Sequence, residues 1–383
     1  MFDVECLRKF FAATVAVFFV LAAEADPVSS PKFLGSQTCS SSSCHGGAGE
    51  KSNQYTIWST HDFHHARPYA TLETARSERL AEVLKIGNPT QSARCTVCHA
   101  PFATVPTDRL SHDAAVTEGI SCETCHGPAE NWIRSHTRTD YTHADRVAAG
   151  MRDLKNLYVR ANTCVACHQN LDPEIRAAGH PELIFEMDGQ CVTMPRHWPK
   201  SADFGPKLWL AGQSAALREM SWQLSNQKTD VTVQERCAGL FWVLRTVSQD
   251  RGDAPVLKQD SPVTTEDLSR IRDWADRLAQ AAESSPPSEQ LVRRGLFLLA
   301  NAADSFTDTT VPVSLQARRA ERLVLALDRL ILGVNEARTN SEANKSLSKL
   351  FADVQSLPDF DSNQFAKDLN TFHSSVAGFL ETK

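Results

Sequence analysis

Two features are missing from most of this sequence. After residue 25 no apolar run is long enough to cross a bilayer, and no stretch of basic residues is interleaved with aromatic ones. The first absence leaves no candidate for a later membrane-spanning helix. The second, with a net charge of only −6, gives no reason to expect a nucleic-acid partner. No Ser/His/Asp or paired-carboxylate constellation indicates other catalytic chemistry.

Histidine is nearly missing from the C-terminal part of the chain. Of the 13 histidines, twelve precede residue 200 and only His373 follows it. Histidine is rarely so segregated unless a metal requires it. The chain of 383 residues is long for one hydrophobic core, and its 42% hydrophobic and 22% charged residues are ordinary for a globular protein. We therefore expect two folded domains.

The first 25 residues have the pattern of a secretory signal peptide. Arg8 and Lys9 precede an apolar run of 14 residues (10–23), and a small-x-small cleavage pattern ends at Ala25. The run is short for a bilayer span, although two acidic residues near its start leave an uncleaved anchor as the alternative. No cysteine follows the run for lipid attachment. We expect signal peptide 1–25 to be removed, which gives a soluble, periplasmic or otherwise exported protein.

Eight cysteines form four pairs, and a histidine directly follows the second member of each pair. Three pairs have the C-x-x-C-H spacing of c-type haem attachment. Each thiol adds to one haem vinyl group, so the two sulfurs must lie about one helical turn apart, and the next residue then directs its imidazole to the iron. The pattern predicts four covalently bound haem c groups with four proximal histidines. The groups are Cys39/Cys44/His45, Cys95/Cys98/His99, Cys122/Cys125/His126 and Cys164/Cys167/His168.

The first of these groups is wider than the other three. Four residues, 40–43, separate Cys39 from Cys44, so this turn must bulge to present both sulfurs. The same spacing occurs in small tetrahaem cytochromes. Zinc ribbons and disulfide frameworks also use paired cysteines, but neither requires a histidine after each second cysteine. The fourfold repetition of that histidine favours haem.

The two parts of the chain predict different structures. Residues 26–200 contain all the haem groups, show little regular periodicity and predict a tetrahaem cytochrome c domain of short helices and loops. Residues 201–383 predict an all-helical bundle domain without cofactor ligands, because apolar residues recur there at helical spacing. The whole chain is therefore expected to be mainly α. The expected helices of the bundle are 208–224, 264–282, 287–299, 314–334 and 361–380.

Several short strings follow one another over roughly 140 residues. They are Trp58 with His65-Ala66-Arg67; Gly119 to Glu123 and Cys125 to Ala129; Trp132 with His136; Cys164 to His168; Ala177 to Pro181 with Phe185-Glu186; and Pro195 to Trp198. In this order they resemble the cytochrome c-554 family of multihaem cytochromes, including larger exported relatives with a helical C-terminal extension. The resemblance implies a mostly helical fold with haems packed in close pairs.

The resemblance also assigns the distal iron ligands. His65 matches the family histidine that follows the tryptophan, His136 the one about ten residues after the third haem group, and His180 the one in the Gly-His-Pro string. His197 is assigned from the last string alone. For each, the alternative is a surface histidine or one that only contacts a ligand. The assigned set is His65 or its neighbour His64, His136, His180 and His197, with Met187 and Met194 as alternative ligands.

One departure from the family lies in the C-terminal half, where relatives can carry a further C-x-x-C-H group. Here Cys237 stands alone, with Leu240 and Phe241 in place of the second cysteine and the histidine. We interpret Cys237 as a buried remnant cysteine. A disulfide with Cys191 is the alternative.

Electron transfer is the leading function. Four irons attached within about 130 residues must lie close together, and two histidines at each iron would exclude substrate. The expected partners are redox proteins, and a membrane-bound oxidoreductase is one candidate for the helical half. The alternative, which the family allows, is a haem enzyme with one five-coordinate iron. It would act on small nitrogen oxides, with nitric oxide or hydroxylamine chemistry, if His180 or His197 does not bind iron.

Overall fold

A computed structural model describes residues 30–198, 205–227, 231–257, 263–285 and 287–380. The proposed signal peptide 1–25 lies outside these residues. Within them the chain folds into helices and loops and contains no strand; one isolated bridge joins Phe33 to Leu110. The prediction of a mainly α fold is confirmed. No helix among the described residues has both the length and the apolar character that a membrane span requires.

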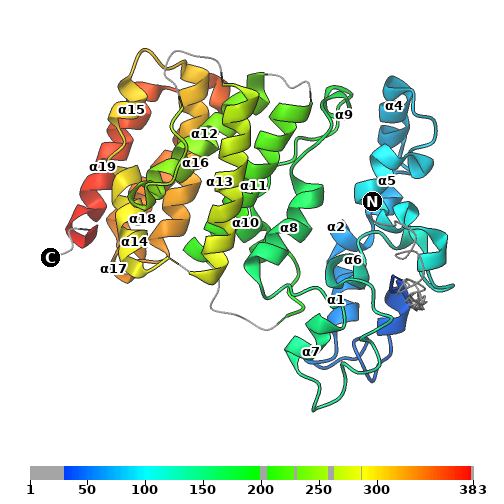
Figure 1. Ribbon diagram of the computed structural model, residues 1–383. Helices are drawn as coiled ribbons and strands as arrows, with labels where there is room; N and C mark the ends of the chain where they lie inside the picture. Colours follow the sequence, from blue (N-terminus) through cyan, green and yellow to red (C-terminus); the bar gives the residue numbers. More distant parts are fainter. Residues whose placement is uncertain (1–29, 199–204, 228–230, 258–262, 286, 381–383) are drawn as a thin grey trace, which may run out of the picture.

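The N-terminal part consists of short helices joined by long loops, on the right in Figure 1. Only α4 and α8 in this part reach ten residues. Short 3-10 turns lie between the helices, including Ser36–Cys39 before the first haem group. The helices are α1 (Gln54–His61), α2 (Phe63–Ala66), α3 (Pro68–Thr71), α4 (Ala75–Leu84), α5 (Ala93–His99), α6 (Cys122–His126), α7 (His143–Ala148), α8 (Leu157–His168), α9 (Pro173–Ala177) and α10 (Met187–Thr193).

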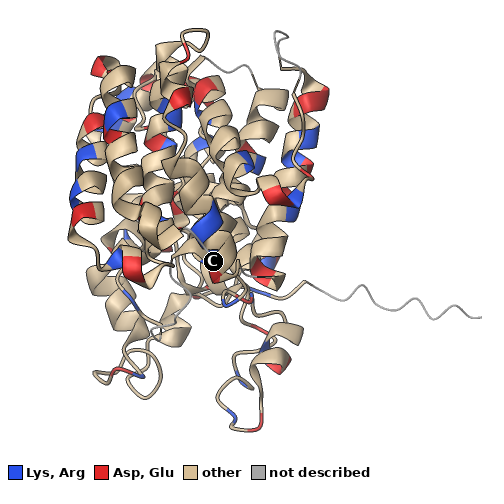
Figure 2. Ribbon diagram, turned by 90° about the vertical axis from the view of Figure 1, so that its left-hand side faces the viewer, with Lys and Arg blue, Asp and Glu red and all other residues tan. Residues whose placement is uncertain are grey.

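The C-terminal part is a bundle of longer helices, on the left in Figure 1. Acidic and basic residues are interspersed along the bundle helices (Figure 2), as on a solvated surface. The helices are α11 (Pro206–Asn226), α12 (Val231–Val247), α13 (Thr265–Ser284), α14 (Glu289–Ala300), α15 (Asp304–Thr307), α16 (Val313–Ile331), α17 (Asn335–Arg338), α18 (Ser341–Asp353) and α19 (Ser362–Leu380).

Helix caps define several starts in this bundle. The Thr264 side chain accepts from the backbone N–H of Asp267, and the Asp267 carboxylate accepts from the Thr264 N–H, which forms a capping box at α13. The Ser288 side chain caps α14 with a single hydrogen bond, which it accepts from the N–H of Leu291. The five predicted helices of this part correspond to α11, α13, α14, α16 and α19, while α12 and α18 were not predicted.

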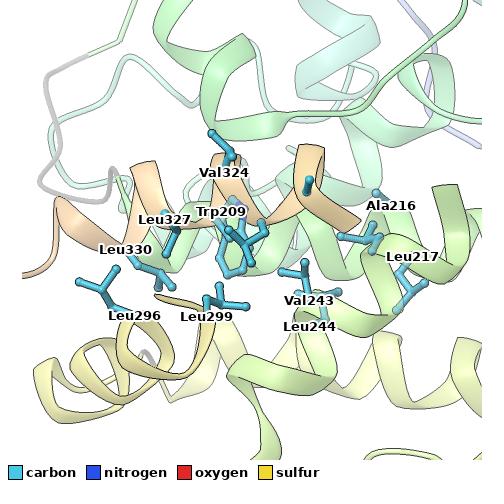
Figure 3. Packing of buried hydrophobic residues seen from close by; sticks show 14 of the residues in the cluster. Trp209, Ala216, Leu217, Val243, Leu244, Leu296, Leu299, Val324, Leu327 and Leu330 are labelled. Carbon is cyan, nitrogen blue, oxygen red and sulfur yellow. The ribbon is translucent and has the colours of Figure 1, made fainter. Parts of the chain in front are cut away.

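The apolar core of the bundle reaches back into the N-terminal part. Figure 3 shows the centre of this core, where side chains of α11, α12, α14 and α16 interdigitate. Leu157, Ala161 and Val165 of α8 belong to the same cluster, as does Met187 of α10. The helix that carries the fourth haem group is therefore packed on the bundle. The division of the chain into domains at residue 200 stays a prediction.

Polar contacts reinforce this attachment of α8. The Tyr158 hydroxyl donates to Asp276 of α13 at 2.9 Å. Arg218 of α11 donates to the same carboxylate at 2.6 Å and to Asn162 of α8 at 2.5 Å. Since these groups come from three helices, they fix the rotation of α8 as well as its position.

Candidate functional site

Three of the four proximal histidines end a helix. The helices α5, α6 and α8 terminate at His99, His126 and His168. Because the helix makes one turn in 3.6 residues, cysteines three positions apart lie on the same face of its last turn. Local helix formation thus produces the thiol spacing that two vinyl groups of one haem require.

The first haem group lies outside a regular helix. The 3-10 turn ends at Cys39, and the backbone N–H groups of Cys44 and Gly46 then both donate to Ser41 O, at 2.9 and 3.0 Å. This tight turn includes the extra residues between the two cysteines. A Cβ at position 46 would lie 1.9 Å from the carbonyl oxygen of Ser40, so the turn requires glycine there.

Three of the four proximal imidazoles face a second imidazole. Two imidazoles that share one iron should have ring centres about 6.2 Å apart, from bonds of about 2 Å and about 1.1 Å from each nitrogen to its ring centre. The observed separations agree with this value, so these residues fit bis-histidine haem ligation. The pairs are His45–His136 at 6.1 Å, His65–His168 at 6.1 Å and His99–His180 at 6.3 Å.

Hydrogen bonds orient most of these rings through Nδ1. A histidine that donates from Nδ1 presents the lone pair of Nε2 to a metal. Five of the six paired rings have an oxygen acceptor at Nδ1. The acceptors are Gln54 Oε1 for His45 (2.9 Å), Asp62 Oδ2 for His65 (2.9 Å), Pro68 O for His99 (3.0 Å), Ile133 O for His136 (2.5 Å) and Pro181 O for His180 (2.7 Å).

Asp62 is the one carboxylate among these acceptors. It is 3% exposed and also caps α2 through the backbone N–H of His65. Burial by itself raises the pKa of Asp62, but the hydrogen bonds and the charge of His65 outweigh burial and hold the pKa below its usual value. The ionised carboxylate therefore increases the basicity of His65.

His126 differs from the other three proximal histidines. Its ring has no imidazole ring contact among the residues that the structure describes. Burial is the largest cause that lowers the pKa of His126, and the nearby His197 and His45 contribute to a pKa of about 4. His197 lies close enough for this electrostatic effect, but its own ring packs edge-on against Trp198 at 4.9 Å. His197, the fourth assigned distal ligand, therefore lies near His126 without the facing geometry of the other pairs.

The remaining histidines of the N-terminal part lie away from these pairs. His64 is exposed, so His65 and not His64 is the residue that faces His168. His61 and His112 are exposed as well and pair through Nδ1 with Thr60 and Asp113. His143 places Nε2 against Asp153 at 2.9 Å. Met187, an alternative ligand, is buried in the core of the bundle.

The cysteines of different groups also meet. The Cys39 thiol contacts the Cys122 thiol, and this contact and burial raise the pKa of Cys122. Cys98 and Cys167 form a second such contact, which with burial raises the pKa of Cys98. Cys125 is close enough to Cys164 to raise its pKa, although burial is the larger cause. The two thiol contacts place group 1 beside group 3 and group 4 beside group 2, and Cys125 of group 3 lies near Cys164 of group 4.

A comparison with protein families relates the first three groups to c-type cytochromes. Residues 38–127 match the family described as cytochrome c554 and c-prime. This stretch contains the first three haem groups, and its similarity to c-type cytochromes implies covalently bound haem c. The fourth group and the bundle lie outside the match. Comparisons with curated proteins and with solved structures gave no match.

Two residues of the cytochrome-like part have roles that the sequence did not reveal. Glu123, within the third haem group, is 1% exposed and accepts from the backbone N–H groups of Leu34, Gly35 and Ala129 at 2.7–2.9 Å. It therefore joins the start of the first haem group to α6. Trp132 packs edge-on against His136, and its buried Nε1 has no partner among the described residues. Such an N–H suits a polar substituent of a haem.

Cys191 and Cys237 are both buried and free, not joined as a disulfide. Cys237 lies 3.9 Å from the Ser221 hydroxyl, and complete burial raises its pKa to about 12. An uncharged buried thiol is a poor nucleophile. Its position agrees with the interpretation of Cys237 as a remnant cysteine within a hydrophobic core.

Proposed function

We propose that the protein is an exported tetrahaem c-type cytochrome that transfers electrons between redox partners. The observation that carries the proposal is the set of three imidazole pairs with ring centres 6.1–6.3 Å apart, each including the histidine of a cysteine group. When bound, haem supplies an iron that exchanges one electron at a time. Two imidazoles leave no position for a substrate, which suits a carrier.

The contacts between thiols support a continuous path. Because Cys39 meets Cys122, Cys125 approaches Cys164, and Cys167 meets Cys98, the four attachment groups follow the spatial order 1–3–4–2. The two ends of this order are the groups of Cys39/Cys44 and Cys95/Cys98. Cys44 is exposed, so the group 1 end is accessible to a partner protein. A membrane-bound oxidoreductase is one candidate.

Haem stoichiometry tests this proposal. Intact mass and a pyridine haemochrome assay on protein matured in a host that attaches haem c should give four haems per chain. A value of three, with unmodified Cys39 and Cys44, would show that the wide first group is not used. Bound zinc, or disulfides between the contacting thiols in place of haem, would overturn the proposal.

The geometry at His126 favours a second candidate function. Because no described imidazole faces this ring as in the other pairs, the third iron would have one exchangeable position. The protein would then be a haem enzyme acting on small nitrogen oxides. Electron paramagnetic resonance separates the two functions: a purely low-spin spectrum supports the carrier. One high-spin haem that binds nitric oxide and turns it over with a donor supports the enzyme.

A further inference from the structure

One segment approaches three of the four haem groups. This segment, residues 180–197 (the ligand segment), begins at His180, which faces His99, and ends at His197, beside His126. Between them, Gln190 of α10 places its amide 3.3 Å from Nδ1 of His168. The path of this segment therefore affects ligands of groups 2, 3 and 4 together.

Three arginines of the bundle hold the ligand segment through ion pairs, which we call the arginine clamp. Arg236 belongs to α12, and Arg322 and Arg329 to α16. The side chains of Arg236 and Arg322 are 5% and 4% exposed. The pairs are Arg236–Glu182, Arg322–Glu186 and Arg329–Asp188.

Further polar contacts fix the same stretch of backbone. Arg236 donates to Leu183 O at 3.2 Å. Gln213 of α11 is 1% exposed and donates to the Glu186 carboxylate at 2.7 Å and to Phe185 O at 3.4 Å. Groups from α11, α12 and α16 thus hold both the side chains and the backbone of the ligand segment.

Each pair has one member that is at most 5% exposed and one that is partly exposed, and stability alone does not explain such pairs. Removing two charges from water costs several kcal/mol per ion, and well-packed apolar residues often replace a buried pair without loss of stability. What a buried pair does provide is one defined geometry, since any displacement leaves a charge unpaired. The arginine clamp is therefore suited to a segment whose exact position matters.

Gln190 connects the clamp to the fourth haem group. It lies two residues after Asp188, and its Oε1 is buried without a partner among the described residues. Its Nε2 lies 3.3 Å from both His168 Nδ1 and Ile184 O. The Gln190 amide thus links the imidazole of His168 to the backbone of the ligand segment, and a shift of that backbone would displace this contact.

We propose that the arginine clamp makes the bundle a scaffold for axial ligation, with Arg236, Arg322 and Arg329 as positioning residues for the histidines of the ligand segment. The inference rests on the proposed haem binding. The helical half then has a role inside the molecule. A partner-docking role would instead place its function on the outer surface.

Arg322→Lys tests the proposal in the full-length holoprotein. It keeps the charge but loses the planar guanidinium that fits a carboxylate. The matched control is Arg293→Lys: Arg293 of α14 is 15% exposed and pairs with Glu289 and Glu336 within the bundle. Burial raises the pKa of Glu186 to about 7, so both proteins are compared at pH 8, where this carboxylate is charged.

We expect Arg322→Lys to give an additional high-spin signal, from up to one haem per chain, or altered low-spin g-values. Arg293→Lys should lower the melting temperature with an unchanged spectrum. An Arg322→Lys spectrum identical to that of the wild type would overturn the proposal, whatever the two melting temperatures. If Arg322→Lys does not fold, Arg236→Lys and Glu182→Gln apply the same criterion to the pair nearest His180. A wild-type haem count other than four would contradict the proposed function. The arginine clamp would still be tested by comparing the spectra of the variants with that of the wild type.

Discussion

The two parts of the chain differ in what fills their interiors. Between residues 30 and 156 the buried apolar side chains are Leu72, Phe102, Trp132, two prolines and four alanines. From residue 205 onward, long helices share one cluster of leucine, valine and aromatic side chains (Figure 3). A chain of the first kind buries too little apolar surface to offset its conformational entropy. The comparison indicates that the first part depends on its cofactors for a core, whereas the second part has its own.

The largest expected effect follows from withholding haem. In a host without haem-attachment machinery, we expect the N-terminal part to stay unfolded and the bundle to retain its helices. Limited proteolysis with mass spectrometry should then yield resistant fragments from residues 205–380 and none from residues 30–150. Equal resistance of both parts to proteolysis without haem would contradict the inference that only the N-terminal part depends on cofactors for its core. The haem-loaded protein serves as the control, in which both parts should resist.

A cavity in the bundle should affect one part only. Leu327 of α16 is fully buried, so Leu327→Ala should lower the free energy of unfolding by about 3 kcal/mol. The reduced and oxidised haem spectra at 25 °C should not change. Leu332→Ala, at a position 43% exposed, is the control and should have little effect. An altered haem spectrum in Leu327→Ala alone would show that the two parts are coupled through the core.

Glu123→Gln should weaken the N-terminal part in a complementary way. The substitution exchanges a carboxylate oxygen that accepts backbone N–H groups for an amide donor, at a cost of about 2 kcal/mol. Hydrogen exchange should accelerate at Leu34 and Gly35 while the bundle amides keep their rates. Glu130→Gln is the matched control, because Glu130 also accepts from a backbone N–H, that of Lys32, at an exposed position. Equal effects of the two variants would contradict a special role for Glu123.

A smaller, pH-dependent effect is expected at the start of α13. Hydrogen bonds from the backbone and side chain of Thr264, and then Arg270, lower the pKa of Asp267 to about 2 from an ordinary 3.8. Since the folded-state pKa is depressed, this contribution to stability is present above about pH 4 and is lost as the pH falls toward 2. Melting curves of Thr264→Ala and wild type should therefore converge over this range. A constant difference down to pH 2 would contradict the assignment.

The smallest expected effect concerns one reduction potential. Asp62→Asn replaces the carboxylate that accepts from His65 and makes this ligand less basic, so the potential of the His65–His168 site should rise by tens of mV. Spectroelectrochemical titration measures the shift. Asp113→Asn is the control, because Asp113 pairs with the fully exposed His112. Identical titration curves for Asp62→Asn and wild type would show that His65 is not a ligand.

The same contrast explains how much could be predicted from the sequence. Amphipathic periodicity and caps such as Thr264 and Ser288 are local signals, so they predicted five helices of the bundle. The helix α12 was missed because it is apolar around much of its circumference and thus has little periodicity. Phe241 and Val243 are both buried, although residues two positions apart point in nearly opposite directions from a helix.

The cofactor groups also divide into local and non-local features. The thiol spacing and each proximal histidine are local, so the four groups were predicted from the sequence. Which distal histidine faces which proximal one depends on the whole fold and could not be predicted; only the set of candidates could. The pairing of His65 with the fourth group and the role of Glu123 as an acceptor of backbone N–H groups are both non-local features.

The three imidazole pairs join residues roughly 80 to 100 positions apart, and their direction along the chain is not uniform. His136 and His180 follow their partners His45 and His99, whereas His65 precedes His168. Under the proposed export with the N-terminus first, group 1 and group 2 would emerge before their second histidines, and group 4 after its own. Group 4 would then have both of its histidines as soon as it emerges, whereas groups 1 and 2 would have theirs only after later parts of the chain have emerged.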